Sequence, residues 1–313
     1  MKILVTPTSI KPGDPRLKKL EDFADELVFN PLGKPLGEED LLALLQDCDG
    51  YLAGLDQVTE KVIRGCPKLK AISRYGVGYD RVDIAAAKKA GIGVAITPGA
   101  NSEAVGELSV AMMLALARNI PQLNDSTKNG GWIRVNGTEL FGKALAIIGL
   151  GAIGKVVARC AAGFSMKVVA YDPYINEDYC RSHGIEAASL EQAVSQADFI
   201  SLHLPLTEGT YHMVDEALLS KMKDGTILIN CSRGGILDEQ AVCKAVESGK
   251  LRGVGLDAFE VEPPKDNPLF RYSNVIATPH TGAHTDEAVG NMIAMAVDNL
   301  IDMLSGKECR NRV

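Results

Sequence analysis

Three short segments bring an arginine, acidic residues and a histidine together with glycines or prolines. They are residues 230–235 (NCSRGG), 256–263 (LDAFEVEP) and 278–283 (TPHTGA). An arginine can bind a carboxylate and polarise a carbonyl oxygen through paired N–H groups. A histidine can give or take a proton near neutral pH, and a neighbouring carboxylate raises its pKa and fixes its tautomer. Arg233 and His280 therefore offer the two functions that reduction of a 2-keto acid requires.

Each of these residues also has an ordinary structural interpretation when it is taken alone. An arginine beside two glycines is more often a surface residue, and a histidine after a proline is often part of a structural loop. Glu260 and Glu262 could form a solvated face, and either could pair with the histidine. The catalytic interpretation depends on all three segments standing together at expected strand ends, where open α/β sheets bind their ligands.

A glycine-rich turn, Gly149-x-Gly151-x-x-Gly154, follows an expected strand and opens an expected helix. Its glycines permit a tight turn, close approach of a pyrophosphate to the backbone, and packing of the helix on the strand. Asp172 ends the next expected strand, about twenty residues on, where an acid can bond the ribose hydroxyls of NAD and disfavour the 2′-phosphate of NADP. The run also fits the GxxxxGK of a P-loop, but Val156 replaces the Ser or Thr that would hold Mg²⁺. A nucleoside triphosphatase is therefore not expected.

Short β-branched runs alternate with helical patterns along most of the chain, which predicts βα units and parallel sheets. The expected strands cover residues 3–5, 51–53, 71–73, 94–96, 144–148, 167–171, 199–203, 226–230, 253–256 and 275–277. The expected helices cover residues 38–46, 59–64, 82–90, 102–118, 153–162 and 285–304. Pro121 is expected to end the helix of residues 102–118, before a polar stretch at 122–142. Because the final helix follows the complete second run of units, we expect the second domain to be inserted in the first.

The composition excludes several classes of partner. The chain has 33 Lys and Arg against 40 Asp and Glu, a net charge of −7, and no dense basic run. Nucleic acid and membranes are therefore not expected as partners. The seven cysteines have no C-x-x-C spacing, and the N-terminal apolar run is too short for a signal peptide. We expect a cytoplasmic protein with reduced thiols.

Taken together, the motifs resemble the D-isomer-specific 2-hydroxyacid dehydrogenase family over essentially the full chain. Besides the glycine turn and Asp172, the similar segments are RYGVGYDRVD (74–83), NSEAVGE (101–107), HLPLT (203–207), NCSRGG (230–235), DAFEVEP (257–263) and TPHTGA (278–283). The resemblance implies an α/β protein with two doubly wound parallel-sheet domains. A flavodoxin-like substrate domain would comprise residues 1–97 and 285–313, and an inserted Rossmann domain of residues 98–284 would bind NAD.

The resemblance also implies a role for individual residues. Arg233 would orient the substrate, His280 would be the acid and base, and Glu262, which precedes a proline, would be its partner rather than Glu260. NADH would deliver hydride to C2 while protonated His280 supplies the proton. Asp257 would bond the nicotinamide carboxamide. The other cofactor-binding positions would be Gly149, Gly151, Ala152, Ile153, Gly154, Asp172, Pro205, Thr207, Cys231, Ser232, His280, Gly282 and Ala283. The other substrate-binding positions would be Arg74, Val77, Gly78, Asn101 and Arg134, with the backbone N–H groups of Val77 and Gly78 on the substrate carboxylate.

Within the family, the chain most resembles the D-3-phosphoglycerate dehydrogenases, and it is expected to be a short form without their C-terminal regulatory domain. Arg74 and Arg134 fall where those enzymes carry basic residues for the phosphate, whereas Gly54 stands where they usually carry an arginine. The substrate could therefore be 3-phosphoglycerate, with 3-phosphohydroxypyruvate as its keto form, or glyoxylate and hydroxypyruvate. The family also dimerises, which implies a homodimer through about residues 101–142.

Two other classes of protein are alternatives to a D-2-hydroxyacid dehydrogenase, and each would behave differently. An NAD(H)-sensing binding protein of the same fold would bind NADH without turning over any keto acid. A zinc-dependent dehydrogenase would need clustered ligands, and the five histidines do not pair with cysteines at ligand spacing. No metal is therefore expected.

Overall fold

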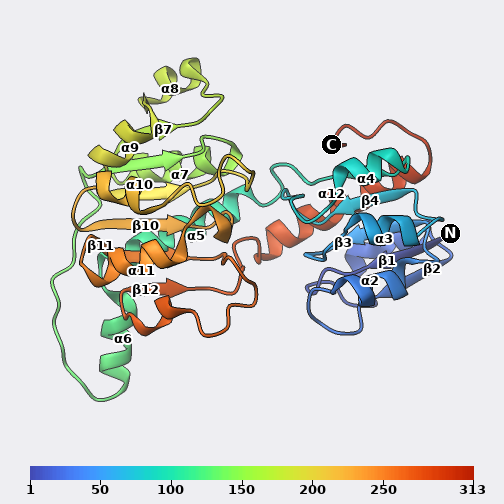
Figure 1. Cartoon of the computed structure of the whole chain (residues 1–313), viewed down its shortest axis with the longest axis horizontal. Coiled ribbons are helices and arrows are strands. Elements are labelled where there is room, and N and C mark those ends of the chain that lie inside the picture. The colour runs from blue at the N-terminus through green and yellow to red at the C-terminus, as the bar shows by residue number, and fades with distance from the viewer. The chain divides into compact units, whose positions relative to one another are not determined.

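The computed structural model describes residues 1–313, and its chain divides into two compact units (Figure 1). Unit 1 comprises Met1–Asn101 together with His284–Val313, and unit 2 comprises Ser102–Ala283. The sequence expectation placed the corresponding boundaries at residues 97/98 and 284/285. Each unit contains its own parallel sheet with helices on both faces, as the alternating βα pattern predicted.

Unit 1 has a five-stranded parallel sheet in the order β2-β1-β3-β4-β5, the flavodoxin-like order. Its strands are β1 Lys2–Val5, β2 Glu26–Phe29, β3 Gly50–Ala53, β4 Ala71–Arg74 and β5 Gly93–Ala95. Its helices are η1 Pro15–Leu17, α1 Lys18–Glu21, α2 Glu38–Leu45, α3 Glu60–Gly65, α4 Ile84–Lys89 and α12 Asp286–Leu304. Because alternate side chains of a strand face opposite ways, Leu4 joins the core under α2 and α3, whereas Ile3 and Val5 join the core under α12.

Unit 2 has a seven-stranded parallel sheet in the order β12-β11-β10-β9-β6-β7-β8. Its strands are β6 Ala144–Ile148, β7 Lys167–Tyr171, β8 Glu186–Ala187, β9 Phe199–Leu202, β10 Thr226–Asn230, β11 Leu251–Leu256 and β12 Val275–Ala277. Six of these strands follow the doubly wound Rossmann order, and β12 extends the sheet beyond β11. The predicted fold class, two doubly wound parallel-sheet domains, is confirmed.

Unit 2 contains seven helices, most of which pack on the two faces of its sheet, whereas α6 projects away from it (Figure 1). They are α5 Ser102–Ala117, α6 Ile120–Lys128, α7 Ala152–Gly163, α8 Glu177–His183, α9 Leu190–Gln196, α10 Glu216–Lys221 and α11 Glu239–Glu247, with short turns η2 Gly234–Ile236 and η3 Pro268–Arg271. Helices α5 and α7 approach closely at Gly106, where a Cβ atom would lie 2.5 Å from the Val156 Cγ1 atom. None of the helices combines the length and apolar character that a membrane crossing demands.

The expectation for Pro121 and the stretch after it is wrong in part. Helix α5 ends at Ala117, and Asn119 adopts the left-handed conformation with φ 53°. A second helix, α6, then starts at Ile120 with Pro121 in its first turn. Proline fits a helix start because the N–H that it lacks would have no partner there. The proline signal was therefore assigned to the end of one helix instead of the start of the next.

Residues 129–143, which we call the arm, connect α6 to β6 along the edge of the sheet where the strands begin (Figure 1). The arm is bound to the rest of unit 2 by two hydrogen bonds. The Thr138 N–H donates to the Ala117 carbonyl at 2.8 Å, and the Arg252 guanidinium donates to the Asn136 carbonyl at 2.9 Å. Most of its side chains are solvated, with Trp132 78% and Phe141 72% exposed.

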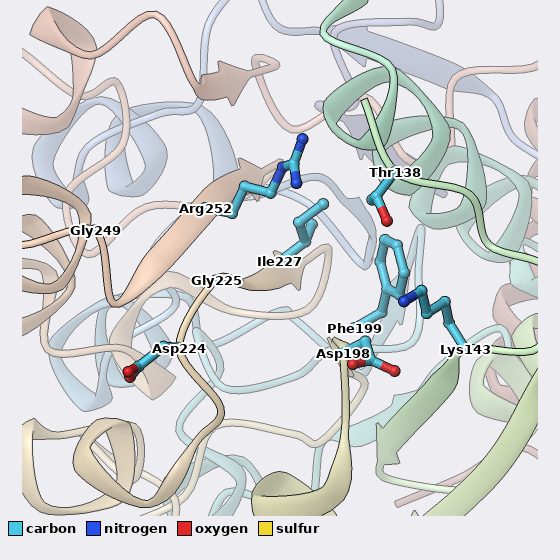
Figure 2. Close-up of a pocket in the computed structure, with 9 residues that line it drawn as sticks. All are labelled: Thr138, Lys143, Asp198, Phe199, Asp224, Gly225, Ile227, Gly249 and Arg252. Carbon is cyan, nitrogen blue, oxygen red and sulfur yellow. The ribbon is translucent and has the colours of Figure 1, made fainter. Parts of the chain in front are cut away.

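A cavity of about 460 Å³ lies under the end of the arm at this amino-terminal edge (Figure 2). Phe199 and Ile227, near the starts of β9 and β10, are buried residues in its lining. The full lining is Thr138, Lys143, Asp198, Phe199, Asp224, Gly225, Ile227, Gly249 and Arg252. The cavity therefore lies on the edge of the sheet opposite to the glycine turn, which follows the carboxyl end of β6.

Candidate functional site

The glycine turn has the close contacts that its sequence pattern predicts. Gly149 has φ 102°, and a Cβ atom there would lie 2.7 Å from the His203 carbonyl group. A Cβ atom on Gly154 would lie 2.1 Å from the Gly149 oxygen. Beside Gly151, in contrast, no atom lies within 4 Å of the corresponding position, which leaves room for a ligand at the start of α7. Side chains are excluded at the two positions where backbone meets backbone.

Asp172, at the end of β7, lies against this turn. One carboxylate oxygen accepts a hydrogen bond from the Leu150 N–H at 2.8 Å, and the other accepts one from the Tyr174 N–H at 2.8 Å. The carboxylate is thus fixed beside the turn and remains partly exposed. The HLPLT segment follows β9 on the other side of the turn, and its Pro205 and Thr207 are exposed.

His203 is the residue of this segment that turns inward. Its Nε2 atom lies 2.8 Å from the Ser201 hydroxyl, whereas Nδ1 is enclosed without a hydrogen-bond partner. Part of the residue reaches the surface. A proton added to the neutral ring would nevertheless leave a charge on a ring whose Nδ1 atom is shut off from water. Burial lowers the pKa of His203 to about 3, so the ring is neutral at physiological pH.

This burial predicts a pH dependence of stability. The unfolded ring has a pKa of about 6.5, so between that value and about 3 only the unfolded state binds the proton. The free energy of unfolding should therefore fall as the pH drops below 6.5, by about 2 kcal/mol at pH 5 from this residue alone. Urea unfolding of wild type and His203→Asn at pH 7.5 and 5 measures the difference. Equal losses of stability in both proteins would contradict the assignment.

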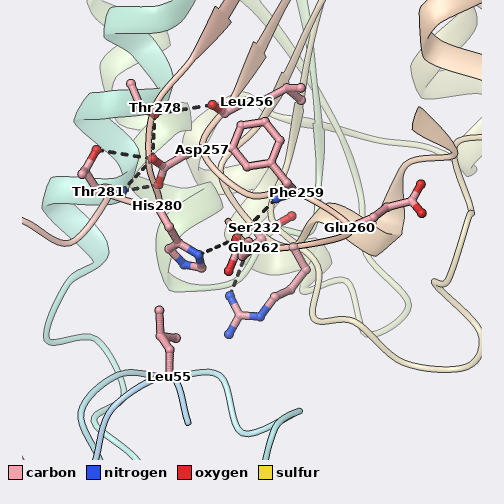
Figure 3. Close-up of polar contacts among 12 residues, drawn as sticks. Leu55, Ser232, Leu256, Asp257, Phe259, Glu260, Glu262, Thr278, His280 and Thr281 are labelled. Atoms are coloured by element: carbon pink, nitrogen blue, oxygen red, sulfur yellow. Dashed lines mark hydrogen bonds and ion pairs between the residues drawn. The ribbon is translucent and has the colours of Figure 1, made fainter. Parts of the chain in front are cut away.

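His280 and Glu262, predicted as a pair, are in contact at the carboxyl edge of unit 2 (Figure 3). The His280 Nδ1 atom lies 2.8 Å from Glu262 Oε1, and the side chains are 28% and 15% exposed. Glu262 Oε1 also lies 3.3 Å from the Phe259 N–H, which donates to it. His280 has φ 52°, a left-handed conformation that is uncommon outside glycine and that the surrounding contacts must hold in place.

Glu260 has different partners. Its Oε1 atom accepts from the Glu239 N–H at 3.0 Å and lies 3.2 Å from His212 Nε2. The Glu239 carboxylate in turn accepts from the Glu260 N–H at 2.9 Å and from the Asn267 side chain at 2.7 Å. Burial raises the pKa of Glu239. The choice between the two glutamates, open from the residues alone, is therefore decided by geometry: Glu260 anchors its loop, and Glu262 meets the histidine.

Asp257 holds the loop that carries His280 (Figure 3). Its Oδ1 atom accepts from the Thr278 hydroxyl and the Thr281 N–H, both at 2.7 Å, and Oδ2 accepts from the Gly282 N–H at 2.7 Å. Asp257 is 2% exposed. The carboxylate thus has partners on both sides of His280 in sequence, Thr278 before it and Thr281 and Gly282 after it. The predicted contact with a nicotinamide carboxamide stays a prediction, and the loop contacts through Thr278 and Thr281 were not foreseen.

Arg233 follows β10 at the same edge. Its guanidinium donates to the Ser232 carbonyl at 2.8 Å, and its own carbonyl accepts from the Asn230 side chain at 2.8 Å. A Cβ atom on Gly234 would lie 1.8 Å from the Phe259 carbonyl carbon, so the segments of Arg233 and Glu262 meet backbone to backbone. Burial raises the pKa of the neighbouring Cys231 thiol to about 12, which keeps it neutral and unreactive. Ser232 and Ala283 are partly buried at this edge.

The substrate residues expected in unit 1 lie at the carboxyl end of β4 and beyond β5. Arg74 is 4% exposed, and its guanidinium donates to the carbonyls of Ala53 at 3.0 Å, Gly78 at 2.8 Å, and Gly54. Val77 and Gly78 are half-buried. The Asn101 Oδ1 atom is enclosed without a hydrogen-bond partner. The described bonds of Arg74 hold loops together, and its role as a substrate ligand stays a prediction.

Arg134 is not brought to the other candidate residues of its own unit. It is exposed on the arm, and the arm contacts unit 2 at Ala117 and Arg252, beside the cavity where the strands begin. Arg233, Glu262 and His280 follow the opposite, carboxyl ends of β10, β11 and β12. Arg134 therefore lies apart from these residues within unit 2, and its role as a substrate ligand stays a prediction.

Comparison with known proteins gives one family. The family model for the NAD-binding domain of D-isomer specific 2-hydroxyacid dehydrogenases matches residues 110–282. A D-3-phosphoglycerate dehydrogenase of Methanocaldococcus jannaschii is 42% identical over 100% of this chain and 59% of its own length. A glyoxylate reductase of Korarchaeum cryptofilum is 37% identical over 93% of this chain and 90% of its own length. The chain belongs to the D-isomer specific 2-hydroxyacid dehydrogenase family.

The solved structure of a family relative agrees in fold. The D-lactate dehydrogenase from Aquifex aeolicus, complexed with NAD and lactic acid, is 30% identical, with a TM-score of 0.85 over 97% of this chain and 96% of that one. The predictions of the family and of NAD as the cofactor are confirmed. The chain spans about half the length of the curated D-3-phosphoglycerate dehydrogenases that it matches at 41–42% identity.

The family's NAD fits the residues present. The open space beside Gly151 would accept the pyrophosphate at the N-terminus of α7, where Ala152 and Ile153 begin the helix. Asp172 lies beside the turn for the ribose, and Gly282 could not carry a side chain because a Cβ atom there would lie 2.9 Å from Asp257 Oδ2. No group of His, Cys, Asp and Glu side chains with the geometry of a metal site is found in residues 1–313.

Proposed function

We propose that this protein is an NAD-dependent oxidoreductase that transfers a hydride between nicotinamide and C2 of a small 2-hydroxy or 2-keto acid. The observation that carries the proposal is the pairing of His280 with Glu262 at 2.8 Å in one unit with the glycine turn and Arg233. The turn follows β6 and Asp172 follows β7, while the Arg233, Glu262 and His280 segments follow β10, β11 and β12. In a parallel sheet all of these strand ends lie at one edge.

The roles follow from this arrangement. NAD supplies or accepts the hydride when it is bound. Arg233 binds the carboxylate and the C2 oxygen, and its fork of N–H groups stabilises negative charge as it develops on that oxygen. His280 Nε2 donates the proton in reduction and accepts it in oxidation, because Nδ1 is held by Glu262. Glu262 fixes the orientation of the ring through its contact with Nδ1. Asp257 positions the His280 loop.

The test is NADH oxidation by the purified chain with glyoxylate, hydroxypyruvate, pyruvate and 3-phosphohydroxypyruvate. We expect the protein to reduce at least one of these acids, with NADH oxidation faster than in the same mixture without protein. Tight NADH binding with no turnover of any of these acids would contradict the proposal and favour the NAD(H)-sensing binding protein instead. Activity should survive a strong chelator, since the mechanism uses no metal.

Asp172→Ala should reduce the preference for NADH over NADPH. The wild-type carboxylate can bond the ribose hydroxyls and repels a 2′-phosphate, so its removal weakens NADH binding and relieves the repulsion. Comparing Kd for the two cofactors by fluorescence titration measures the ratio. Asp178→Ala, on the exposed helix α8, is the control. An unaltered ratio in Asp172→Ala would remove this residue from cofactor recognition.

We also propose that the chain forms a homodimer through α5 and the arm, about residues 101–142. The arm carries four exposed apolar side chains, Trp132, Ile133, Val135 and Phe141, which a partner copy would cover. A dimer would also account for Arg134, which could reach the site of the other copy. Light scattering should give twice the chain mass of 33.4 kDa, and Trp132→Glu combined with Phe141→Glu should give monomers.

The cytoplasm is the proposed compartment, because all seven cysteines are free thiols.

A further inference from the structure

The loop that carries Glu262 has little packing to hold its backbone in place. It runs from residue 260 to residue 267, between β11 and η3, and forms no helix or strand. None of its residues is buried. In the proposed function, Glu262 must nevertheless stay against the His280 ring while a proton is transferred. The loop therefore needs anchors outside itself.

One carboxylate, that of Glu239, holds the loop on both sides of Glu262. Its Oε1 atom accepts from the Glu260 N–H at 2.9 Å, and its Oε2 atom accepts from the Asn267 side chain at 2.7 Å. Asn267 also caps η3, because its Oδ1 atom accepts from the Leu269 N–H at 3.0 Å. Glu262 thus lies in a short loop whose first and last residues are bound to the same group.

The attachment is reciprocal at the start of α11. Glu239 is the first residue of this helix, and its N–H donates to Glu260 Oε1 at 3.0 Å. The next two N–H groups, those of Gln240 and Ala241, donate to Asp238 Oδ1, both at 3.0 Å. N–H groups and the positive end of the helix dipole therefore stabilise the carboxylates that gather here. The exchange between Glu239 and Glu260 has the form of a capping box, but it joins two separate segments.

Helix α11 gives Glu239 a rigid base. Its buried side chains in a core cluster of unit 2 are Ala241, Val242, Cys243, Ala245 and Val246. The turn η2, which precedes the helix, is buried as well. A Cβ atom on Gly234 in this turn would lie 1.8 Å from the Phe259 carbonyl carbon, directly before the loop. The loop is therefore bound to the core of the unit and not to another surface segment.

We infer that Glu239 is a positioning residue for the proposed reaction: by binding both ends of the loop, it holds the Glu262 carboxylate against His280. Figure 3 shows Glu262 beside His280, whereas the Glu260 side chain extends away from both. Glu239 acts through Glu262, since its own two oxygens are bound to Glu260 and Asn267. Without these bonds the loop can shift, and a displacement of about 1 Å is enough to slow a reaction severely.

Glu239→Ala removes both bonds from the loop. We expect kcat to fall by a factor of about 10–10² for the keto acid that the wild-type protein reduces fastest. Glu216→Ala is the matched control, because Glu216 also begins a helix after a capping aspartate, but its carboxylate pairs with the exposed Lys244. Its kcat should stay close to that of the wild-type protein. Equal kcat values in the two folded variants would overturn the inference.

A double-mutant cycle with Glu262→Ala separates positioning from a general loss of structure. If Glu239 acts through Glu262, then adding Glu239→Ala to Glu262→Ala should lower kcat further by no more than about twofold. A loss by the same factor with and without the Glu262 carboxylate would mean that the two residues act independently, and would overturn the inference. A wild-type kcat in Glu262→Ala itself would count against the proposed function instead.

An exchange of donor and acceptor tests the same bond if Glu239→Ala does not fold. Asn267→Asp keeps an oxygen for the Leu269 N–H but places a second carboxylate against Glu239, so kcat should fall. Combining Asn267→Asp with Glu239→Gln reverses the bond, because the glutamine amide can donate to the aspartate and still accept from the Glu260 N–H. The combined variant should recover most of the lost kcat. No recovery over Asn267→Asp alone would contradict the role of Glu239.

Discussion

Replacing His280 by alanine is expected to lower kcat by a factor on the order of 10²–10⁴ for every keto acid that the wild-type protein reduces. The reason is that the Glu262 carboxylate holds the His280 ring at 2.8 Å through Nδ1 and leaves Nε2 for proton transfer. The Kd for NADH should change little. Steady-state kinetics and fluorescence titration of NADH measure the two quantities.

His183→Ala is the matched control for this experiment. His183 is an exposed histidine at the end of α8, where its Nδ1 atom contacts only the Tyr179 carbonyl and the Ser182 hydroxyl of the same helix. Its removal should leave kcat close to that of the wild-type protein, because its Nδ1 atom contacts only residues of its own exposed helix. If His280→Ala behaves like His183→Ala, the histidine has no part in proton transfer and the mechanism is wrong.

Arg233→Lys is expected to lower kcat/KM by about 10²-fold or more, although the charge is kept. A guanidinium can bind the carboxylate and the C2 oxygen with parallel N–H groups, whereas an ammonium acts as a point charge without that fork. The Ser232 carbonyl, which accepts from Arg233 at 2.8 Å, helps to set the direction of the fork. The loss should appear in kcat as well as KM, because the interaction strengthens as the oxygen gains charge.

The exposed Arg181 provides the control for the same substitution. It lies on α8 with Glu177 and Asp178 as its partners, and Arg181→Lys should retain wild-type kcat/KM. A rise in KM alone in Arg233→Lys, with kcat unchanged, would show that Arg233 binds the substrate and the transition state equally and does not lower the barrier of the chemical step.

Strand ends and glycine contacts could be predicted from the sequence because they are local. The run at 144–148, the turn and helix after it, and Asp172 behind the next strand form one βαβ unit, and its strands, helix start and acid are found within one residue of where the pattern placed them. The fold class follows from repeating such units. The short strand β2 was not predicted, because Glu26–Phe29 lacks a pattern that distinguishes it from a loop.

The parts that could not be predicted depend on contacts between distant segments. Glu260 and Glu262 look alike in sequence, and only the position of Glu239 on α11 shows that Glu260 is anchored away from His280. The partners of Asp257 come from a loop more than twenty residues later, and those of Arg74 come from the end of β3. A motif indicates that a charge is present, but its hydrogen-bond partners determine whether it faces a ligand or the protein.

The most direct test of hydride transfer to C2 uses NADH that carries deuterium at both C4 positions. The purified chain would be incubated with this cofactor and the keto acid that it reduces fastest, and the 2-hydroxy acid product would be analysed by mass spectrometry. The mechanism predicts one deuterium on C2 of the product in the wild-type protein, and loss of product formation in His280→Ala. A product without deuterium at C2, or NADH binding with no 2-hydroxy acid formed from any substrate, would contradict it.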